Sequence, residues 1–431
     1  MTGVSPERIR PAHPTPAAIA GRLLRPFLPL AGAVPILWLT LMPGRATDVV
    51  DVTPWCVVCG ARGIADGLLN LALFVPLGWA LGANGRRPKD ALAIGLLLSA
   101  GIEIAQIFLP NRFPGIGDVL YNGAGACLGA LLWAAGAGGL RPAARHPGRR
   151  VRAWGGLGLA AILSVPLLLA PALPPGRYMA HWAPGLEGYD VFRGRLLDAR
   201  IAGGAVRQGT VTPRDSIPRR LLEGTTVELS FRVGPAPKNL APIFTLTRGE
   251  RVQTLLIGVD DRDVIVRYRT WSERLLLDRA DLRDPGTPGT WEEGDTVALA
   301  VEAAGEGVRV RSGDGPARRL AIPSSRGWSF LIYGKELDRR WGGALDFAWL
   351  VLWAIPLGLW APGLRAAGPA AAWAAALLLV PFVSPVLSPG WPGVAGIAIG
   401  PVVGRLLSRT ALRVLGLEAR PDPGGTGTHP G

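Results

Sequence analysis

Charged residues are scarce in this sequence. They make up 18% of the 431 residues, whereas hydrophobic residues make up 49%, and a typical soluble domain carries about 25% charged residues. The mean hydropathy is +0.28. Intrinsic disorder is excluded because it requires few apolar residues and dense charge. A wholly soluble protein is disfavoured because charged residues are few and the mean hydropathy is positive.

Residues suited to covalent or metal chemistry are also rare. The three cysteines cannot build a disulfide-rich secreted scaffold. Only four histidines occur, at positions 13, 146, 181 and 429, which disfavours a Ser-His-Asp triad and a multi-histidine metal centre. No phosphate-binding or dinucleotide-binding glycine pattern lies between a strand and a helix. The sequence therefore predicts no cofactor and no metal.

The net charge of +14 is unevenly distributed. Residues 174–344 carry 26 basic and 22 acidic residues, a net of +4, whereas the rest of the chain carries 20 basic and 10 acidic residues, a net of +10. The long apolar runs lie in that second, more basic part. The chain thus divides into hydrophobic flanks that contain scattered basic residues and a polar middle segment.

The hydrophobic flanks predict a multi-pass α-helical membrane protein, because a spanning helix needs about 20 mostly apolar residues. Two of the candidates are short and contain Pro76 and Pro356. The eight predicted spans are Pro26–Pro43, Gly67–Ala83, Ala91–Leu109, Asp118–Leu140, Ala153–Leu173, Leu345–Trp360, Pro369–Val386 and Val394–Ala411.

Basic residues predict how these spans are threaded, since cytoplasmic loops are enriched in Lys and Arg. With the N-terminus inside, 17 basic residues fall on inner segments and span ends, and only Arg45, Arg62 and Arg112 fall in short outer loops. We therefore expect both termini in the cytoplasm and residues 174–344 outside, in a bacterial cytoplasmic membrane. The lipid bilayer thereby accounts for the basic charge, and nucleic acid is not an expected partner.

The middle segment predicts an exported all-β domain. Segments 227–233, 243–247, 252–259, 264–270 and 297–301 alternate apolar and polar residues, with Gly- and Asp-rich turns between them. Many short strands at this spacing are typical of a sandwich or jelly roll. The strand pattern resembles the concanavalin-like and laminin-G superfamily, which implies carbohydrate binding.

Two features of this domain have a structural and a functional reading. Asp260, Asp261 and Asp263 are either a solvated hairpin tip, which we favour, or a calcium site. Four tryptophans could stack on sugars, but core packing is at least as good an explanation. These are Trp271, Trp291, Trp328 and Trp341.

Cys56 and Cys59 form a C-x-x-C pair in the first outer loop. Such a pair is a redox dithiol, half of a zinc site, or a short-loop disulfide. A redox dithiol is typical of a βαβ context, which is not predicted here. A zinc site would need two more ligands, and the sequence has no matching C-x-x-C or His pair. An oxidised pair outside the membrane and free thiols both remain open.

Polar residues at helical spacing mark the second, third and fourth predicted spans. Each span carries one polar stripe, and the predicted threading places all three stripes near the outer leaflet. One interpretation is an outward-facing polar pocket; the other is a hydrogen-bonded clamp between helices. The candidate binding residues are Asp66, Asn70, Glu103, Gln106, Arg112, Asp118 and Asn122.

The spacing of these residues is more specific than the stripes alone. It reads Asp66-x3-Asn70-x3-Phe74-x-Pro76-x-Gly78, then Ser99-x3-Glu103-x2-Gln106-x2-Leu109-Pro110-x-Arg112, then Asp118-x3-Asn122-x2-Gly125-x3-Gly129. The pattern resembles the VanZ-like family over about residues 26–140. The resemblance implies that the seven candidates belong to the family's polar signature. It also implies a link to resistance against teicoplanin-type glycopeptides, without assigning a reaction.

Together these observations predict five parts: a cytoplasmic segment 1–25, a VanZ-like membrane domain 26–173, an extracytoplasmic sandwich 174–344, three further spans 345–411 and a disordered cytoplasmic tail 412–431. The leading hypothesis is a cell-envelope protein that engages an envelope glycan, a lipid-linked precursor or a glycopeptide. The alternative is a membrane enzyme in which Glu103 or Asp118 acts as general acid or base on a lipid-linked substrate. A binding role is favoured over an enzymatic one.

Overall fold

The computed structural model of the chain describes residues 23, 25–43, 54–140, 147–186, 188–210, 225–249, 252–261, 263–279, 281–285, 291–304, 307–332, 334–360, 364–384 and 386–414. The predicted N-terminal segment 1–25 and the predicted disordered tail 412–431 lie almost entirely outside these residues.

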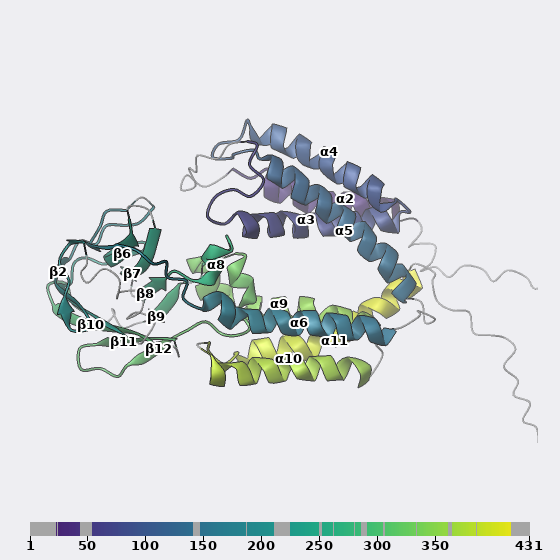
Figure 1. Cartoon of the computed structure of the whole chain (residues 1–431). Helices are drawn as coiled ribbons and strands as arrows, with labels where there is room; N and C mark the ends of the chain where they lie inside the picture. Colours follow the sequence, from purple (N-terminus) through teal and green to yellow (C-terminus); the bar gives the residue numbers. More distant parts are fainter. Residues whose placement is uncertain are drawn as a thin grey trace, which may run out of the picture.

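Four helices form a first bundle, drawn in purple and blue in Figure 1. Its hydrophobic core contains Ile36, Phe74, Ile102 and Ala126, one residue from each helix. The first of these helices follows a short 3-10 turn, Arg25–Phe27. The helices are α2 (Leu28–Thr40), α3 (Gly63–Ala83), α4 (Pro88–Gln106) and α5 (Ile116–Leu140).

Local sequence explains where some of these helices begin and how closely they pack. Pro88 stands in the first turn of α4, where its missing N–H is not needed. The Asp90 side chain accepts a 3.1 Å hydrogen bond from the Arg87 N–H at the helix start. A Cβ atom on Gly125 would collide with the Leu71 carbonyl, so this glycine allows α5 to lie close against α3.

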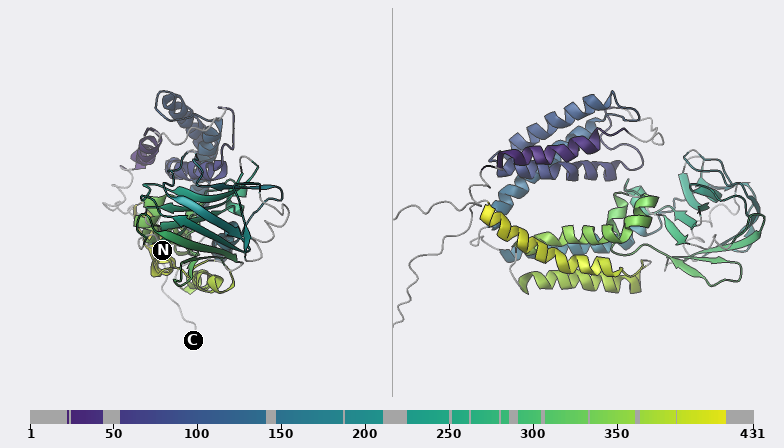
Figure 2. Two further views of the ribbon diagram at one scale, coloured as in Figure 1. Left: turned by 90° about the vertical axis from the view of Figure 1, so that its left-hand side faces the viewer. Right: turned by 180° about the vertical axis from the view of Figure 1, so that it is seen from behind.

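The remaining long helices form a second bundle around Trp373, which is fully buried. The Trp373 indole donates a 2.7 Å hydrogen bond to the Gly155 carbonyl and so ties α10 to α6. Figures 1 and 2 show this bundle separated from the first one along most of the helix length. Its helices are α6 (Pro147–Leu169), α9 (Lys335–Trp360), α10 (Leu364–Val383) and α11 (Trp391–Val414).

A helix coincides with each of the eight predicted spans, and within the described residues five of them, α3, α6, α9, α10 and α11, are long and apolar enough to cross a membrane. The α2 helix has 13 residues. Lys89, Asp90 and Glu103 place three charged residues on α4. The described residues therefore form a helical membrane protein with five candidate spans, and the predicted count of eight is not confirmed.

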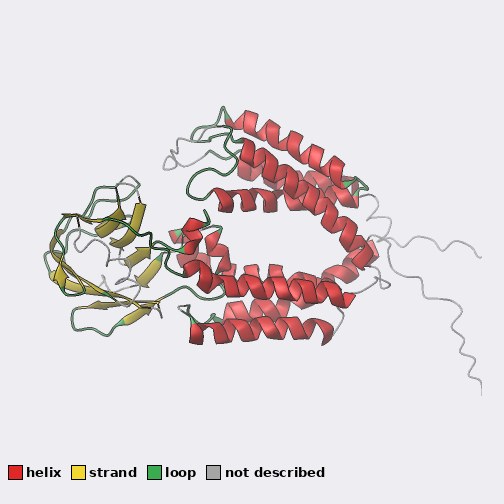
Figure 3. Cartoon of the chain, viewed as in Figure 1, coloured by secondary structure: helices red, strands yellow, loops and turns green. Residues whose placement is uncertain are grey.

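The β strands gather at one end of the helices, as Figure 3 shows. They form two six-stranded antiparallel sheets, with strand orders β4-β1-β6-β7-β8-β9 and β12-β11-β10-β5-β2-β3. The predicted sandwich is therefore confirmed. The strands are β1 (Tyr178–Trp182), β2 (Arg195–Ile201), β3 (Gly204–Ala205), β4 (Gly209–Thr210), β5 (Thr226–Arg232), β6 (Ala241–Arg248), β7 (Val252–Asp260), β8 (Asp263–Tyr268), β9 (Leu282–Pro285), β10 (Thr296–Ala304), β11 (Gly307–Ser312) and β12 (Arg318–Leu320).

Alternation of side chains builds the sandwich core, because successive residues of a strand point to opposite faces. In β5, Val227, Leu229 and Phe231 are buried, whereas Glu228 and Arg232 are exposed. The core extends beyond the strands into the second bundle, where it includes residues at the ends of α6 and α10. These are Val165, Leu169 and Val380. The sandwich is therefore joined to the second bundle through apolar packing.

The α9 helix begins earlier than the predicted span at Leu345. Because its first turns are polar, the sequence predicted that they belong to the exported domain rather than to a span. In the structure Asp338 forms an ion pair with Arg326, and Arg339 lies 3.9 Å from Asp261 at a strand turn. The helix therefore starts inside the polar region, and Trp341 belongs to α9 rather than to the sandwich.

Candidate functional site

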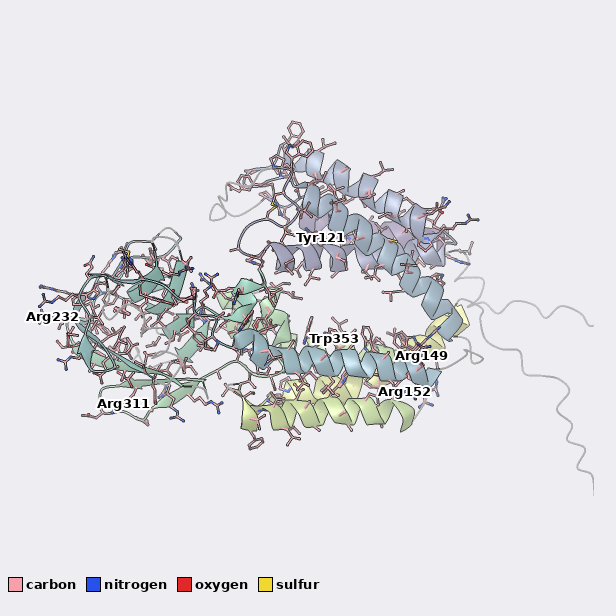
Figure 4. The ribbon with its side chains drawn as sticks, viewed as in Figure 1. Tyr121, Arg149, Arg152, Arg232, Arg311 and Trp353 are labelled. Atoms are coloured by element: carbon pink, nitrogen blue, oxygen red, sulfur yellow. A yellow bond between two sulfur atoms is a disulfide. The ribbon has the colours of Figure 1, made fainter. Side chains whose placement is uncertain are left out.

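A cavity of about 490 Å³ opens at the sandwich end of the first bundle. It lies between the first turns of α3 and α5 and the loops that precede them. Figure 4 shows Tyr121 of α5 in the half of the bundle nearer the sandwich. The polar residues lining the cavity are Arg62, Asp66, Asn70, Arg112, Asp118 and Tyr121.

Asn70 and Asp118 form the direct link between α3 and α5 in this cavity. The Asn70 Nδ2 donates a 2.6 Å hydrogen bond to the Asp118 Oδ1. Asp118 is the third residue of α5, where the positive end of the helix dipole stabilises a carboxylate. The hydrogen bond and the helix end both favour the ionised form of this carboxylate on the cavity wall.

Arg112 is held in place by backbone carbonyls. Its Nε donates a 2.8 Å hydrogen bond to the Met42 carbonyl, and its Nη2 donates a 3.3 Å hydrogen bond to the Leu39 carbonyl. Both acceptors lie at the C-terminal end of α2, which carries partial negative charge. The guanidinium is thus oriented by the end of α2 while it lines the cavity.

Tyr121 fits against α3 because the facing residue is glycine. A Cβ atom on Gly67 would overlap the Tyr121 ring. The ring therefore occupies the space beside Asp66 and Asn70 that any larger residue at position 67 would fill. Sequence reasoning did not select Tyr121, although it lies three residues after Asp118 and so on the same face of α5.

Glu103, Gln106 and Asn122 do not line the cavity. Glu103 accepts a 2.8 Å hydrogen bond from the Gly115 N–H, and Gln106 donates a 2.8 Å hydrogen bond to the Thr40 carbonyl. Asn122 donates a 2.8 Å hydrogen bond to the Ser99 hydroxyl, and the Asn122 Oδ1 is buried without a partner among the described residues. These three side chains join α4 to α2, to α5 and to the loop before α5.

The seven predicted site residues therefore divide into two groups. Asp66, Asn70, Arg112 and Asp118 line the cavity, whereas the other three act as interhelical clamps. Both interpretations of the polar stripes apply, each to different residues. Helical spacing alone could not separate them, because it shows which residues share a face but not what that face meets.

Arg62 joins the cavity to the sandwich. It lies 3.6 Å from Asp66 and 3.1 Å from Asp278, and its Nη2 donates a 3.2 Å hydrogen bond to the Leu331 carbonyl. The Ile64 and Ala65 N–H groups both donate 3.2 Å hydrogen bonds to the Leu276 carbonyl. The first turn of α3 is thus capped by a backbone carbonyl of the sandwich domain.

Sequence reasoning treated Arg62 only as an outer-loop charge. Its spacing of four residues from Asp66 was the signal available in the sequence, since residues at i and i+4 are neighbours on a helix. The contacts with Asp278 and Leu331 connect positions more than 200 residues apart in the chain. No local pattern could have indicated them.

A disulfide joins Cys56 and Cys59 in the loop before α3, and both residues line the cavity. The loop is fixed further by the Ile116 N–H, which donates a 2.9 Å hydrogen bond to the Pro54 carbonyl. Gly117 approaches this loop so closely that a Cβ atom would meet the Val57 carbonyl. Cys127 of α5 is a free, partly buried thiol.

The sandwich residues singled out in the sequence have structural partners. Arg283 lies 3.0 Å from Asp260 and 3.1 Å from Asp263, so a guanidinium occupies the position that a cation would take. No group of three metal-ligating side chains occurs among the described residues. Asp261 is exposed, as a solvated hairpin tip requires, but Asp260 is buried in its ion pair with Arg283 and is not a solvated residue.

The tryptophans differ from one another in their surroundings. Trp291 packs against Phe231, with ring centroids 5.4 Å apart, and the buried Trp328 donates a 2.6 Å hydrogen bond to Asp346. Trp271 and Trp341 are exposed, and the Arg274 guanidinium covers the Trp271 ring at 4.6 Å. Of these four tryptophans, the two exposed rings, Trp271 and Trp341, are the ones available for stacking on a sugar.

Residues 33–137 match the model of the VanZ/LLP1 family. The matched segment contains α2, α3 and α4 and most of α5, and therefore the walls of the cavity. The comparisons with curated proteins and with solved structures found no match.

Proposed function

Because residues 33–137 match the VanZ/LLP1 family, we propose that the protein is a multi-pass component of the bacterial cytoplasmic membrane that holds an envelope glycan, a lipid-linked precursor or a glycopeptide. Both termini lie in the cytoplasm, and the sandwich lies outside. The polar cavity faces the same side and receives the ligand. A role in resistance to teicoplanin-type glycopeptides follows if the ligand is the drug or its target.

The observation that carries this proposal is the direct contact between the cavity and the sandwich. The Leu276 carbonyl of the sandwich domain accepts the Ile64 and Ala65 N–H groups at the start of α3. Asp66, one residue further along the same turn, lines the cavity. A ligand in the cavity would therefore lie next to the exported domain.

Basic residues at the opposite helix ends support the orientation. Arg149 and Arg152 of α6 lie at the end of the second bundle that is farthest from the sandwich (Figure 4). Arg86, Arg87 and Lys89 surround the turn between α3 and α4, which lies at the corresponding end of the first bundle (Figure 2). This arrangement agrees with the enrichment of Lys and Arg in cytoplasmic segments.

Reporter fusions test the orientation. A fusion near residue 250 should report an extracytoplasmic position, and a fusion after residue 86 should report a cytoplasmic one. A cytoplasmic reading near residue 250 would overturn the proposal, because the cavity and sandwich would then face the wrong compartment for an envelope ligand.

Two neutral variants test the role of the cavity. Asp118→Asn removes a charge from the cavity wall while retaining an oxygen that can accept from Asn70. Glu103→Gln removes a charge outside the cavity and keeps the acceptor for the Gly115 N–H, so it is the matched control. We expect Asp118→Asn to abolish the envelope or glycopeptide-susceptibility phenotype at unchanged membrane abundance, and Glu103→Gln to retain it. A wild-type phenotype from Asp118→Asn would contradict the cavity's role.

A membrane enzyme is the second candidate function. Asp118 supports it, because a carboxylate in a cavity can accept a proton from a bound substrate and, once protonated, can return one. Glu103 gives it little support, since this side chain lies outside the cavity and accepts the Gly115 N–H. Turnover of a lipid-linked substrate by the purified protein, lost in Asp118→Asn, would favour the enzyme over the binding protein.

A further inference from the structure

Arg112 and Asp118 are two opposite charges in one cavity that do not form an ion pair. Both line the cavity of about 490 Å³. Arg112 has no carboxylate within 4.0 Å among the described residues, and its only described hydrogen bonds go to the Met42 and Leu39 carbonyls. Asp118 has no cation within 4.0 Å in the same part of the chain and accepts from the neutral Asn70.

The other charges of the cavity are already matched. Arg62 pairs with Asp66 and Asp278 at the edge next to the sandwich. Arg112 and Asp118 are therefore the charges that remain for a ligand. Each is fixed by hydrogen bonds to backbone or amide groups, so neither has to reorganise in order to bind a partner.

Charges near membrane depth are costly unless they are paired or hydrated. Two such charges held apart across a cavity favour a ligand that supplies both counter-charges. A guanidinium binds phosphate or carboxylate through charge-assisted hydrogen bonds, and a carboxylate binds an ammonium in the same way. An aromatic ring such as that of Tyr121, which lines the same cavity, adds a favourable surface for the ammonium.

We propose that this cavity binds a zwitterionic group, with its phosphate or carboxylate on Arg112 and its ammonium on Asp118. The inference rests on the proposed function, because it assumes that the cavity is open to the outer side of the membrane. The group can come from the headgroup of a zwitterionic lipid or from a soluble molecule. A purely anionic ligand would leave Asp118 unmatched, and a purely cationic ligand would leave Arg112 unmatched.

Binding to the purified full-length protein tests the proposal. The soluble probes are phosphoethanolamine, which carries charges of both signs, ethanolamine, which is only cationic, and glycerol phosphate, which is only anionic. The lipid probes are nanodiscs that contain phosphatidylethanolamine or phosphatidylglycerol, with retained lipid measured by native mass spectrometry. We expect the zwitterionic member of either set to bind at least tenfold more tightly than the singly charged members.

Variants identify the residues responsible. Asp118→Asn should weaken zwitterion binding about tenfold or more, and Glu103→Gln should leave it unchanged. Arg112→Gln also loosens the end of α2, so Arg112→Lys is included; it keeps the cation and should retain more binding than Arg112→Gln. Preference for the soluble probe or for the lipid identifies the source of the group.

Three results would overturn the inference: failure of both zwitterionic probes to bind, equal binding of glycerol phosphate or ethanolamine, and wild-type binding by Asp118→Asn. Its failure is distinguishable from failure of the proposed function. If the reporter fusions and the Asp118→Asn phenotype behave as expected while the zwitterion does not bind, only the identity of the ligand is wrong.

Discussion

Asn70 donates a 2.6 Å hydrogen bond to Asp118 and thereby connects α3 to α5 at the mouth of the cavity. The two residues are 48 positions apart in the chain, yet each stands in the first two turns of its helix. The amide is the only described hydrogen-bond donor to this carboxylate. A substitution that replaces this hydrogen bond by a repulsion should therefore weaken the α3–α5 contact.

Asn70→Asp should make the protein sensitive to pH. The substitution places a second carboxylate beside Asp118, and two adjacent carboxylates cannot both ionise without repulsion. The repulsion is absent at low pH, where at least one of the two carboxylates is protonated, and it appears as the pH rises. Stability is therefore retained at low pH and lost as the pH rises.

The measurement is the melting temperature of the detergent-solubilised variant between pH 4 and pH 8. The wild-type protein, measured over the same range, is the control. An Asn70→Asp melting temperature that falls at acidic pH relative to the wild type would contradict the hydrogen bond as described.

Gly125→Ala should destabilise the first bundle by about 1–3 kcal/mol, the usual cost of overpacking. A Cβ atom at this position meets the Leu71 carbonyl of α3, whereas a Cβ atom on Gly101 of α4 meets nothing. Gly101→Ala is thus the matched control and should be neutral or stabilising by up to about 1 kcal/mol, the difference in helix propensity. Thermal unfolding of both variants checks the prediction, and equal melting temperatures would refute close packing at Gly125.

The pair Arg62 and Asp278 should show coupling in a double-mutant cycle. Their side chains lie 3.1 Å apart and are 43% and 10% exposed, so we expect about 1 kcal/mol after discounting for solvent. The exposed pair Arg200 and Asp198, at 2.8 Å, is the control and should show little coupling. Limited proteolysis of the loop that contains Leu276 should accelerate in Arg62→Gln, and an unchanged rate would mean that Arg62 does not hold the sandwich to the bundle.

Tyr268 should ionise only at strongly alkaline pH. Burial raises the pKa of its phenol to about 12, and its hydroxyl donates a 3.1 Å hydrogen bond to the Leu169 carbonyl. The folded state thus holds this proton more tightly than the unfolded state, whose tyrosines have a pKa of about 10. This protonated phenol contributes stability below about pH 10, and the contribution is lost between about pH 10 and pH 12. The total loss across that range is about 3 kcal/mol.

Absorbance titration near the tyrosinate band measures this ionisation. Subtracting the titration of Tyr268→Phe isolates the contribution of the one phenol. A midpoint near pH 10 for that difference would show that the ring is accessible to water.

The architecture was largely predictable from the sequence, because apolar runs and strand alternation are local properties. The eight helices and the strands 227–233, 243–247, 252–259, 264–270 and 297–301 follow from such patterns. The start of α9 at Lys335 did not follow, since its first turns are polar. These turns are stabilised by charges of the sandwich, including Arg326, that no hydropathy window contains.

Part of the cavity lining was predictable from the sequence, but Arg62 and Tyr121 were not selected and Glu103, Gln106 and Asn122 lie outside the cavity. Helical spacing placed Asp66, Asn70 and Asp118 on shared faces, and these residues do line one cavity. It could not show that Glu103 turns to the Gly115 backbone. The partners of Arg62 were equally hidden, because ion pairs between distant segments leave no local signal.

The Leu276 carbonyl connects the sandwich directly to the turn of α3 that lines the cavity. The sandwich shares a hydrophobic core with the second bundle. It contacts the first bundle through a few hydrogen bonds and an ion pair at the start of α3. Any displacement of the sandwich relative to the first bundle would therefore act first on the turn that carries Asp66.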